Sequence, residues 1–538
     1  MFRKTSLQSS IFNIERLIPG ALPANDWSFI YKEKILPLID EEQFRHLYSN
    51  VGRPNYSIRT MVSLLIFMGR EKLTWRDAEF QFPRRIDWMI ATNTPIGKTF
   101  IDHSTLFDFY KRISGDEVVY NIFVRMRDEF LQACGISTKK QRTDSFFIGG
   151  WLEILSRYGL FKETIRKFLQ SLRKHNADLY DKIKDELSKN YLDKDFDLTE
   201  KDKELAHKRI TLMAKDLLKI IKAFRNHDQI KSYETFKILR KIFTQQCEVK
   251  EQDSHNPEII IKKKPDSDTV CSPHNTSVRY VRKGKQRVTG HKAFVSETCA
   301  EENEAQFITD VEVTDATEAD SKQLGKIQDR LEQNDCKPEK FFGDAGFVNG
   351  ATIIKSKDKD IELEGPSAGR SQSFEAYESD ERPLDAGDFD ISFNESNDIH
   401  VDKCPAGQIP VDQKRSEKTG KINVHFDADV CRNCEKSERC PVKIGVKIAT
   451  FNVDEANYVG AARHHKYMEN PEYRKECATR AGVEGTVSEF TRAHGMRKSR
   501  HRNKEDTKPQ MLFAAIACNI KRFIRYTQNC GKLTPAFQ

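Results

Sequence analysis

The sequence predicts an α/β core preceded by an all-α N-terminal domain, with a helical excursion and a small cysteine-containing, β-rich insertion. Three observations predict this: apolar residues recur at helical spacing over residues 27–133, two short apolar runs each carry one Asp, and four cysteines cluster between residues 404 and 440. The chain has 538 residues, which is room for roughly three or four domains of about 100–200 residues each.

The composition narrows the class of protein. Hydrophobic residues make up 38% of the chain and charged residues 32%. This composition is typical of a folded protein with a highly charged surface. Its longest apolar run, residues 61–68, is far too short to span a bilayer, and the N-terminus lacks the apolar region of a signal peptide. We therefore expect a cytosolic protein whose 12 cysteines do not form a disulfide framework. The formal net charge of +8 is compatible with a polyanionic partner.

Residues 1–133 are predicted to form the helical N-terminal domain. Thr74 and Asp77 resemble a capping pair for a helix that starts one residue after Thr74. Asp102 or Ser104 can cap a later helix, whose apolar residues fall on one face. Short helices joined by tight turns are typical of a helix-turn-helix module, although a plain helical bundle fits the same pattern.

The central part of the chain alternates between strands and helices. Residues 135–150 and 287–367 are predicted to form the core, and residues 151–286 a helical excursion with a linker. Within the second core segment we expect strands near 290–297, 307–314, 340–347 and 360–367, and a helix over 318–333. Without the excursion, this order of elements is that of an α/β domain of the ribonuclease H type, in which the first and fourth strands lie side by side.

Residues 368–471 are predicted to be an acidic and Cys-rich insertion. Residues 371–403 contain ten Asp or Glu against one Arg and one Lys, so we expect this stretch to lie away from any nucleic acid or to be flexible. The cysteines Cys404, Cys431, Cys434 and Cys440 have the spacing C-x₂₆-C-x₂-C-x₅-C. Four cysteines of this kind can bind one zinc ion tetrahedrally; four reduced thiols in a small β subdomain remain the alternative.

Residues 472–538 are predicted to supply a further core helix, over 472–498, and a basic C-terminal region. Residues 511–524 have the pattern of an amphipathic helix. The densest basic stretch contributes possible phosphate contacts at Arg492, Arg497, Lys498, Arg500 and Arg502. A solvated helix face would have the same composition.

Each of the two apolar runs, TDSFFIGG and KFFGDAGF, carries one carboxylate, Asp144 and Asp344. A buried carboxylate is costly unless it is paired or bound to a cation. Two such groups at neighbouring strands, with a third from the late helix, could hold two Mg²⁺ or Mn²⁺ ions about 3.5–4 Å apart. Glu484 is the preferred third ligand. Glu489 competes but lies about 140° round the helix from it, and Glu476 is a weaker candidate.

These motifs resemble those of bacterial insertion-sequence DDE transposases. The resemblance rests on TDSFFIGG, GDAGF, R-x-x-x-E with a basic stretch after it, YSIRTMVSLLIFMGREKLTWRDAEFQ and RKGKQRVTGHKAFVSETC, and it extends with gaps from about residue 27 to 525. It implies that Asp144, Asp344 and Glu484 are the catalytic, metal-binding residues and that Arg480 is the Arg four residues before the Glu. Two positions depart from the family pattern: Cys477 stands where Tyr is usual and Thr491 where Lys is usual.

The resemblance implies an enzyme that cuts the terminal inverted repeats of its own mobile element and joins the 3′-hydroxyl ends to target DNA. It also implies Mg²⁺ or Mn²⁺ as cofactor, double-stranded DNA as partner, a homodimer as the active form, and a place at the nucleoid in the bacterial cytoplasm. Two rival hypotheses are a catalytically inactive, transposase-derived DNA-binding protein and a metal-dependent nuclease without strand transfer.

Overall fold

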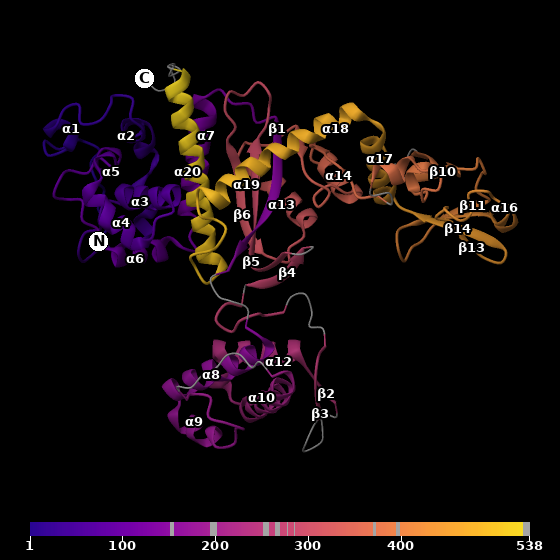
Figure 1. Ribbon diagram of the computed structural model, residues 1–538, viewed down its shortest axis with the longest axis horizontal. Coiled ribbons are helices and arrows are strands. Elements are labelled where there is room, and N and C mark those ends of the chain that lie inside the picture. Colours follow the sequence, from indigo (N-terminus) through magenta and orange to yellow (C-terminus); the bar gives the residue numbers. More distant parts are fainter. Residues whose placement is uncertain are drawn as a thin grey trace.

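The computed structural model describes residues 1–150, 155–193, 202–250, 258–263, 269–276, 278–283, 286–369, 373–393 and 399–530. The molecule is elongated, with a helical region at one end, a mixed sheet in the middle and small sheets at the other end (Figure 1). The mixed α/β architecture with a helical N-terminal region confirms the predicted class. Among the described residues, no helix combines the length and apolar character needed to cross a membrane.

The N-terminal region consists of short helices that pack round one apolar helix. Its α-helices are α1 (Ile14–Leu17), α2 (Trp27–Ile30), α3 (Ile58–Glu71), α4 (Trp75–Gln81), α5 (Ile86–Ala91), α6 (His103–Ile113) and α7 (Val118–Ala133). The predicted capping pair is present, because Thr74 and Asp77 form a reciprocal capping box at the start of α4. Asp102, and not Ser104, caps α6.

A mixed sheet forms the centre of the molecule. Its strands are β1 (Lys140–Gly149), β4 (Arg279–Lys283), β5 (Gln286–Thr298), β6 (Ile308–Asp315), β7 (Lys340–Phe342) and β8 (Glu362–Glu364). The order is β4-β5-β1-β7-β8, with β6 paired to β5. β1 runs antiparallel to β5 and parallel to β7, and β7 runs parallel to β8. Helix α13 (Asp320–Gln333) precedes β7, and α14 (Gly350–Lys357) follows it.

The sheet differs from the sequence-based prediction in detail. β1 starts four residues before Asp144, and β7 ends two residues before Asp344, because Gly343 and Asp344 already belong to the following loop. β4 pairs with β5 as a hairpin, although a linker was predicted over its residues. Other parts of the predicted linker, residues 251–257 and 264–268, lie outside the described residues.

The C-terminal part contains three helical pieces where one helix over 472–498 was predicted, so that prediction is wrong. Helix α18 (Pro471–Cys477) passes through a 3₁₀ turn, residues 478–481, into α19 (Gly482–Arg492), and a loop then leads to α20 (Lys504–Cys530). Helix α20 lies between the N-terminal helices and the sheet, against α3, α7 and β6 (Figure 1). Residues 511–518 of this helix are all buried, so it is apolar on more than one face.

Two further regions have hydrophobic cores of their own. The excursion after β1 contains α8 (Arg157–His175), α9 (Ala177–Lys184), α10 (Lys203–Phe224), α11 (Asp228–Ser232), α12 (Glu234–Gln246) and the hairpin of β2 (Cys247–Lys250) and β3 (Glu258–Ile261). Figure 1 shows these helices below the sheet.

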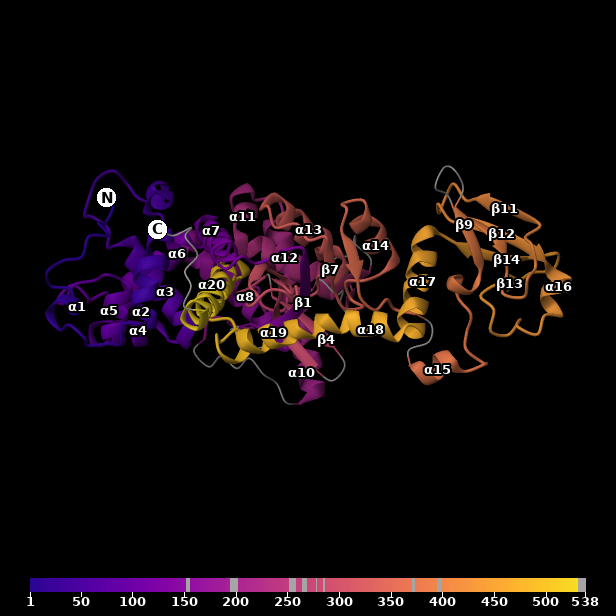
Figure 2. The ribbon, with the colours of Figure 1, turned by 90° about the horizontal axis from the view of Figure 1, so that it is seen from above.

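The second region follows β8 and lies at the end of the molecule opposite the N-terminal helices (Figure 2). It contains α15 (Phe374–Glu378), β9 (Asp390–Phe393), β10 (Ile399–Lys403), β11 (Asp412–Arg415), β12 (Ile422–Asp427), α16 (Ala428–Arg432), β13 (Lys443–Ile444), β14 (Ile448–Val453) and α17 (Glu455–Glu469).

Candidate active site

The register between β1 and β7 brings the two predicted aspartates together. Arg142 on β1 is the partner of Phe342 on β7, and the two strands run in the same direction. Asp144 lies two residues after Arg142, and Asp344 lies two residues after Phe342. The two aspartates are therefore neighbours at the end of the sheet where β7 stops. The sequence-based expectation that these two carboxylates meet therefore has a direct structural counterpart.

Backbone amides hold one oxygen of each aspartate. The N–H of Ser145 donates to Asp144 Oδ1 at 2.7 Å, and the N–H of Gly346 donates to Asp344 Oδ1 at 2.8 Å. A side chain at Gly346 would displace the carboxylates of Asp320 and Asp344, because a Cβ there would lie 2.9 Å from Asp320 Oδ2 and 3.0 Å from Asp344 Oδ1. Both carboxylates are thus oriented by the backbone next to them.

Helix α19 crosses the face of β1 on which Asp144 lies. Alternate residues of a strand share a face, so Arg142, Asp144 and Phe146 point the same way. Phe146 stacks on Phe490 of α19, with 5.9 Å between ring centroids. Arg142 donates to the carbonyl of Thr479 at 2.9 Å, just before α19 begins. The helix is therefore fixed at both ends along β1, and its first turn lies near Asp144.

Arg142 is a positioning residue that the sequence analysis missed. Its guanidinium would lie 1.9 Å from a Cβ at position 482, so only Gly482 allows α19 to start there. It also pairs with Glu297 of β5, which is 1% exposed. The available signal was the alternation of Arg142 with Asp144 along one strand, which places both side chains on the helix-covered face.

Asp144 sits in an environment that disfavours its charge. Burial is the main cause that raises its pKa, to about 6, and the nearby negative charges of Asp344 and Glu484 add to the increase. The hydrogen bond from Ser145 and the positive charge of Arg480 act in the opposite direction. Charges of residues from β1, the loop after β7 and α19 therefore act on one another at this edge of the sheet.

The three acidic candidates on the late helices differ in their surroundings. Glu484 lies in the first turn of α19, its side chain is 64% exposed, and Oε1 is 3.9 Å from a guanidinium nitrogen of Arg480. Glu476, on α18, is paired with Lys340 of β7 at 2.6 Å.

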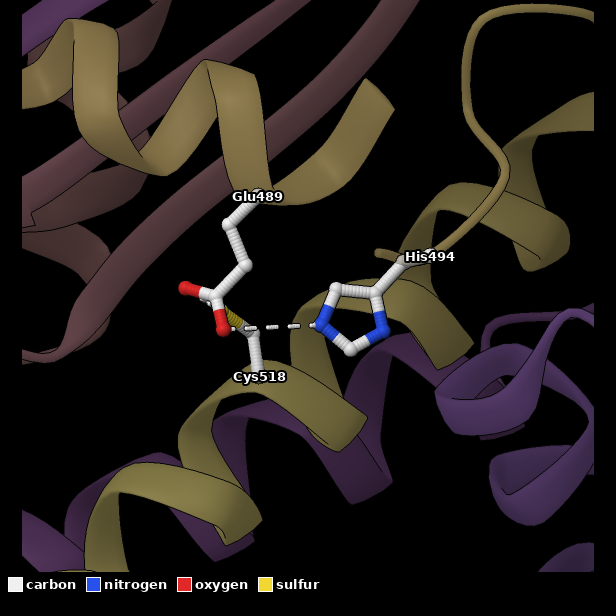
Figure 3. A group of neighbouring side chains, drawn as sticks. All are labelled: Glu489, His494 and Cys518. Atoms are coloured by element: carbon white, nitrogen blue, oxygen red, sulfur yellow. Dashed lines mark hydrogen bonds and ion pairs between the residues drawn. The ribbon is translucent and has the colours of Figure 1, made fainter. Parts of the chain in front are cut away.

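Glu489 points away from this edge, toward α20. Figure 3 shows its carboxylate directed at Cys518 of α20 and at His494, which lies in the loop between α19 and α20. Lys521 donates to Oε1 at 2.9 Å, and Cys518 donates to Oε2 at 3.0 Å. Arg522 also reaches Oε2, at 3.3 Å. Burial raises the pKa of Glu489, but these contacts outweigh it and hold the pKa well below its usual range.

Side chains of metal-binding types gather most tightly elsewhere in the described part of the chain. Three groups have ligand atoms that all lie within 4.8 Å of one another: Glu489 with His494 and Cys518, Glu79 with Asp102 and His103, and Asp385 with Asp388 and His465. Neither the three predicted catalytic carboxylates nor the four clustered cysteines are packed that closely.

Contacts within the protein account for these three groups. Arg382 binds both oxygens of Asp388. Asp102 caps α6, and Glu79 contacts His103 at 2.8 Å. The charge of Glu489 is compensated by Lys521 and Arg522, as described above. We assign no metal to any of these groups, because internal ion pairs and hydrogen bonds already use the ligand atoms.

The predicted DNA-binding residues fall mostly on one exposed loop. Arg492, Arg497, Lys498 and Arg502 are exposed, and Arg480 is half-buried beside Glu484. The loop is attached to the end of β1, because the N–H of Gly149 donates to the carbonyl of Arg497 at 3.0 Å and the N–H of Ser499 donates to the carbonyl of Gly149 at 2.7 Å. These cations therefore lie beyond the strand that carries Asp144.

Arg500 differs from the other predicted contacts. Its guanidinium donates to the carbonyl of Leu73 in the N-terminal region, and its burial lowers its pKa from the usual value. It joins the loop to the N-terminal helices, and we leave it out of the DNA-binding set.

The four cysteines of the insertion surround a common small cavity. Cys404 follows β10, Cys431 lies in α16, and Cys434 and Cys440 lie in the turns between α16 and β13. Burial raises the pKa of the Cys431 thiol, and the other three thiols raise it further. No disulfide joins any cysteine among the residues described.

Two family models match the chain. Residues 26–112, from just before α2 to α6, match a transposase domain (DUF772), and residues 403–524, from the end of β10 into α20, match a transposase DDE domain. The second match contains Glu484 but starts after Asp144 and Asp344. No curated protein and no solved structure matches the chain. The two matched domains confirm the resemblance seen in the sequence: over these two segments the chain is similar to DDE transposases.

Proposed function

We propose that this transposase cuts the ends of its own mobile element and transfers the freed 3′-hydroxyl ends to target DNA, with Asp144, Asp344 and Glu484 as its catalytic carboxylates. The observation that carries the proposal is the parallel register of β1 and β7, which makes the two aspartates neighbours. The strand order and directions suit a sheet of the ribonuclease H type, as the resemblance implied.

The donor set fits Mg²⁺ or Mn²⁺. All three side chains offer carboxylate oxygens, which are the hard ligands that these ions prefer. Asp144 is half-buried and lies near the negative charges of Asp344 and Glu484, so a divalent cation would offset an otherwise unfavourable arrangement. The three carboxylates would hold a pair of such ions, which would supply activation of water or a 3′-hydroxyl and stabilisation of the leaving oxygen of the phosphodiester.

The protein's own groups orient these ligands. The amides of Ser145 and Gly346 each hold Oδ1 of an aspartate, which fixes the orientation of both carboxylates. Arg142 fixes the start of α19, and thus the place of Glu484. Arg480, one turn before Glu484, adds a positive charge at the point where a phosphate would approach.

DNA would lie along the exposed cations beside the carboxylates. Arg492, Arg497, Lys498 and Arg502 extend from the end of β1, where they can neutralise phosphates next to the reacting bond. The acidic stretch around α15 and β9 lies at the end of the molecule opposite the N-terminal helices, away from this loop (Figure 2). We place sequence-specific contacts to the inverted repeats on the N-terminal helices and expect two copies of the chain to pair two element ends.

Two family positions are changed in this chain. Cys477, in place of Tyr, is buried beside Tyr473. Thr491, in place of Lys, turns its hydroxyl back onto the carbonyl of Val487. Neither change touches the three carboxylates, so it is DNA contact and not cation binding that these positions affect. A nuclease without strand transfer is the remaining alternative, and joining to target DNA distinguishes the two.

The test is a cleavage assay on labelled duplexes that carry the inverted repeats flanking the protein's own gene, with Mg²⁺ or Mn²⁺. Wild type should release 3′-hydroxyl ends and join them to a second duplex, whereas Asp344→Asn should do neither. Asp181→Asn, an exposed position on α9, is the matched control and should behave as wild type. Specific binding without metal-dependent cleavage would contradict the proposal.

A further inference from the structure

The insertion between β8 and α17 contains a group of four cysteines that has no role in the proposed transposition chemistry. Within the described part of this insertion, eleven buried residues form the hydrophobic core, which is little for a region that holds two separate small sheets. Three of the clustered cysteines, Cys404, Cys431 and Cys440, pack against that core from outside. Small subdomains of this kind usually need a cross-link or a metal ion for stability.

The first cysteine lies in a turn that presents its sulfur to the others. The N–H of Gly407 donates to the carbonyl of Cys404 at 2.8 Å, and the N–H of Cys404 donates to the carbonyl of Gln408 at 2.9 Å. The N–H of Gln408 donates to Cys404 Sγ at 3.3 Å. Gly407 has φ +79°, a conformation that favours glycine. A backbone N–H directed at the sulfur stabilises a thiolate at this position.

The other three cysteines follow in consecutive turns. The N–H of Cys434 donates to the carbonyl of Cys431 at 3.4 Å, and the N–H of Cys440 donates to the carbonyl of Ser437 at 3.4 Å. Lys436 spans the gap to the first turn, because its ammonium donates to the carbonyl of Pro405 at 2.7 Å. The two cysteine-bearing segments are thus held against each other.

All four cysteines line one small, partly open cavity of about 30 Å³. The rest of the lining is largely apolar, with Pro405, Ala406, Phe426, Val430, Val442 and Ile444. This volume holds one small ion and no larger ligand. Four sulfur donors round such a space select a soft or borderline cation and do not suit Mg²⁺.

We propose that Cys404, Cys431, Cys434 and Cys440 bind one structural Zn²⁺ ion that joins the β9–β10 hairpin to the sheet of β11, β12, β13 and β14. Tetrahedral zinc with Zn–S bonds of about 2.3 Å needs sulfurs roughly 3.8 Å apart. The four sulfurs are more widely spaced than this, so zinc binding draws the two turns together. The site uses all four positions, which makes it structural and closed to substrate.

The test is the zinc content of the purified full-length protein, measured by elemental analysis after exhaustive dialysis. Wild type should contain about one zinc ion per chain. Cys431→Ser and Cys434→Ser should lose it, whereas Cys271→Ser, at a half-buried cysteine of the excursion, should retain it.

A second measurement covers the case in which a variant fails to fold. Wild type stripped with a chelator and reloaded with Co²⁺ should develop the intense sulfur-to-metal absorption of tetrahedral thiolate coordination, and Zn²⁺ should abolish it. Wild type that contains no zinc and shows no such absorption after reloading under reducing conditions would overturn the proposal. Equal zinc in wild type and in Cys431→Ser would also overturn it. Neither result depends on DNA cleavage, so failure here leaves the proposed function untouched.

Discussion

The two faces of α19 carry the same kind of side chain in opposite electrostatic surroundings. Glu484 faces the edge of the sheet near Asp144, whose pKa is raised mainly by burial and further by the charges of Asp344 and Glu484. Glu489 faces α20, where Lys521 and Arg522 approach it and its pKa falls. Three carboxylates at the edge of the sheet have Arg480 as a nearby positive charge, whereas the single carboxylate of Glu489 is paired with both Lys521 and Arg522.

This difference separates a binding site from a structural contact. A group of like charges that the fold brings together without partners is stable only if something from outside compensates it. The Glu489 cluster needs nothing from outside, although it packs metal-binding side chains more tightly (Figure 3). Charge balance therefore identifies the candidate active site better than the closeness of ligand atoms does.

The largest expected effect belongs to Glu484. Glu484→Gln should lower the cleavage rate at least about 10³-fold, because a metal ligand of the transition state is removed. The melting temperature should stay unchanged, because the side chain is 64% exposed. Glu472→Gln, at an exposed position on α18, controls for loss of surface charge. Cleavage within tenfold of wild type would remove Glu484 from the site.

Glu489→Gln should show the opposite pattern. Loss of this charge removes the carboxylate that pairs with Arg522 and Lys521, and we expect the free energy of unfolding to fall by about 3 kcal/mol. Urea titration followed by circular dichroism measures this. Lys521→Met, where 53% of the side chain is exposed, should cost less than about 1 kcal/mol. If Glu489→Gln were as stable as wild type but inactive, the assignments of the two faces would be reversed.

Asp144→Asn should stabilise the protein when no divalent cation is present. Folding raises the pKa of Asp144 from 3.8 to about 6, so the folded state retains a proton that the unfolded state releases between these values. Wild type thus loses stability as pH rises through this window, by up to about 3 kcal/mol. The variant should be more stable at pH 7.5, and the difference should vanish as pH falls toward 4.

Metal binding provides a second comparison between wild type and Asp144→Asn. Added Mg²⁺ should raise the melting temperature of wild type at pH 7.5 and leave that of Asp144→Asn unchanged, because only wild type keeps the full ligand set. Thermal denaturation with and without Mg²⁺ measures both arms. An equal shift in the two proteins would mean that the ion binds elsewhere.

The smallest effect concerns Gly346, which lies between Asp344 and Asp320. Gly346→Ala should displace the Asp344 carboxylate by a few tenths of an ångström and lower cleavage between about tenfold and a hundredfold. Gly325→Ala, in α13, is the control, because no atom lies within 4 Å of a Cβ there. Wild-type cleavage by Gly346→Ala would show that the loop after β7 tolerates repositioning.

The sequence was enough to predict that Asp144 and Asp344 lie at neighbouring strands, because each is a charged residue in or beside a short apolar run. It also predicted the order of β5, β6, α13, β7 and β8, since strand and helix periodicities alternate clearly there. The third carboxylate was harder. Periodicity gives the angle between Glu484 and Glu489 on a helix but does not tell which face meets the sheet.

Long-range contacts explain what the sequence did not reveal. Helix α19 ends at Arg492 because residues 497 and 499 pair with Gly149. Nothing in the sequence near Arg492 indicates this long-range pairing. The role of Arg142 likewise depends on Thr479, 337 positions away. Helix α20 was predicted to be amphipathic because the periodicity of residues 511–524 does not show that a second domain covers its other face.

Helix α20 has a consequence for where a cut can fall. Its buried residues belong to the same continuous hydrophobic core as those of α3, α7 and the sheet, so the N-terminal helices and the carboxylates cannot move independently without opening that core. Under the proposed function, DNA held by the N-terminal helices would therefore be presented at a constant distance from Asp144. The distance between the recognised sequence and the cut bond would then be set by the protein and need not be encoded at the bond itself.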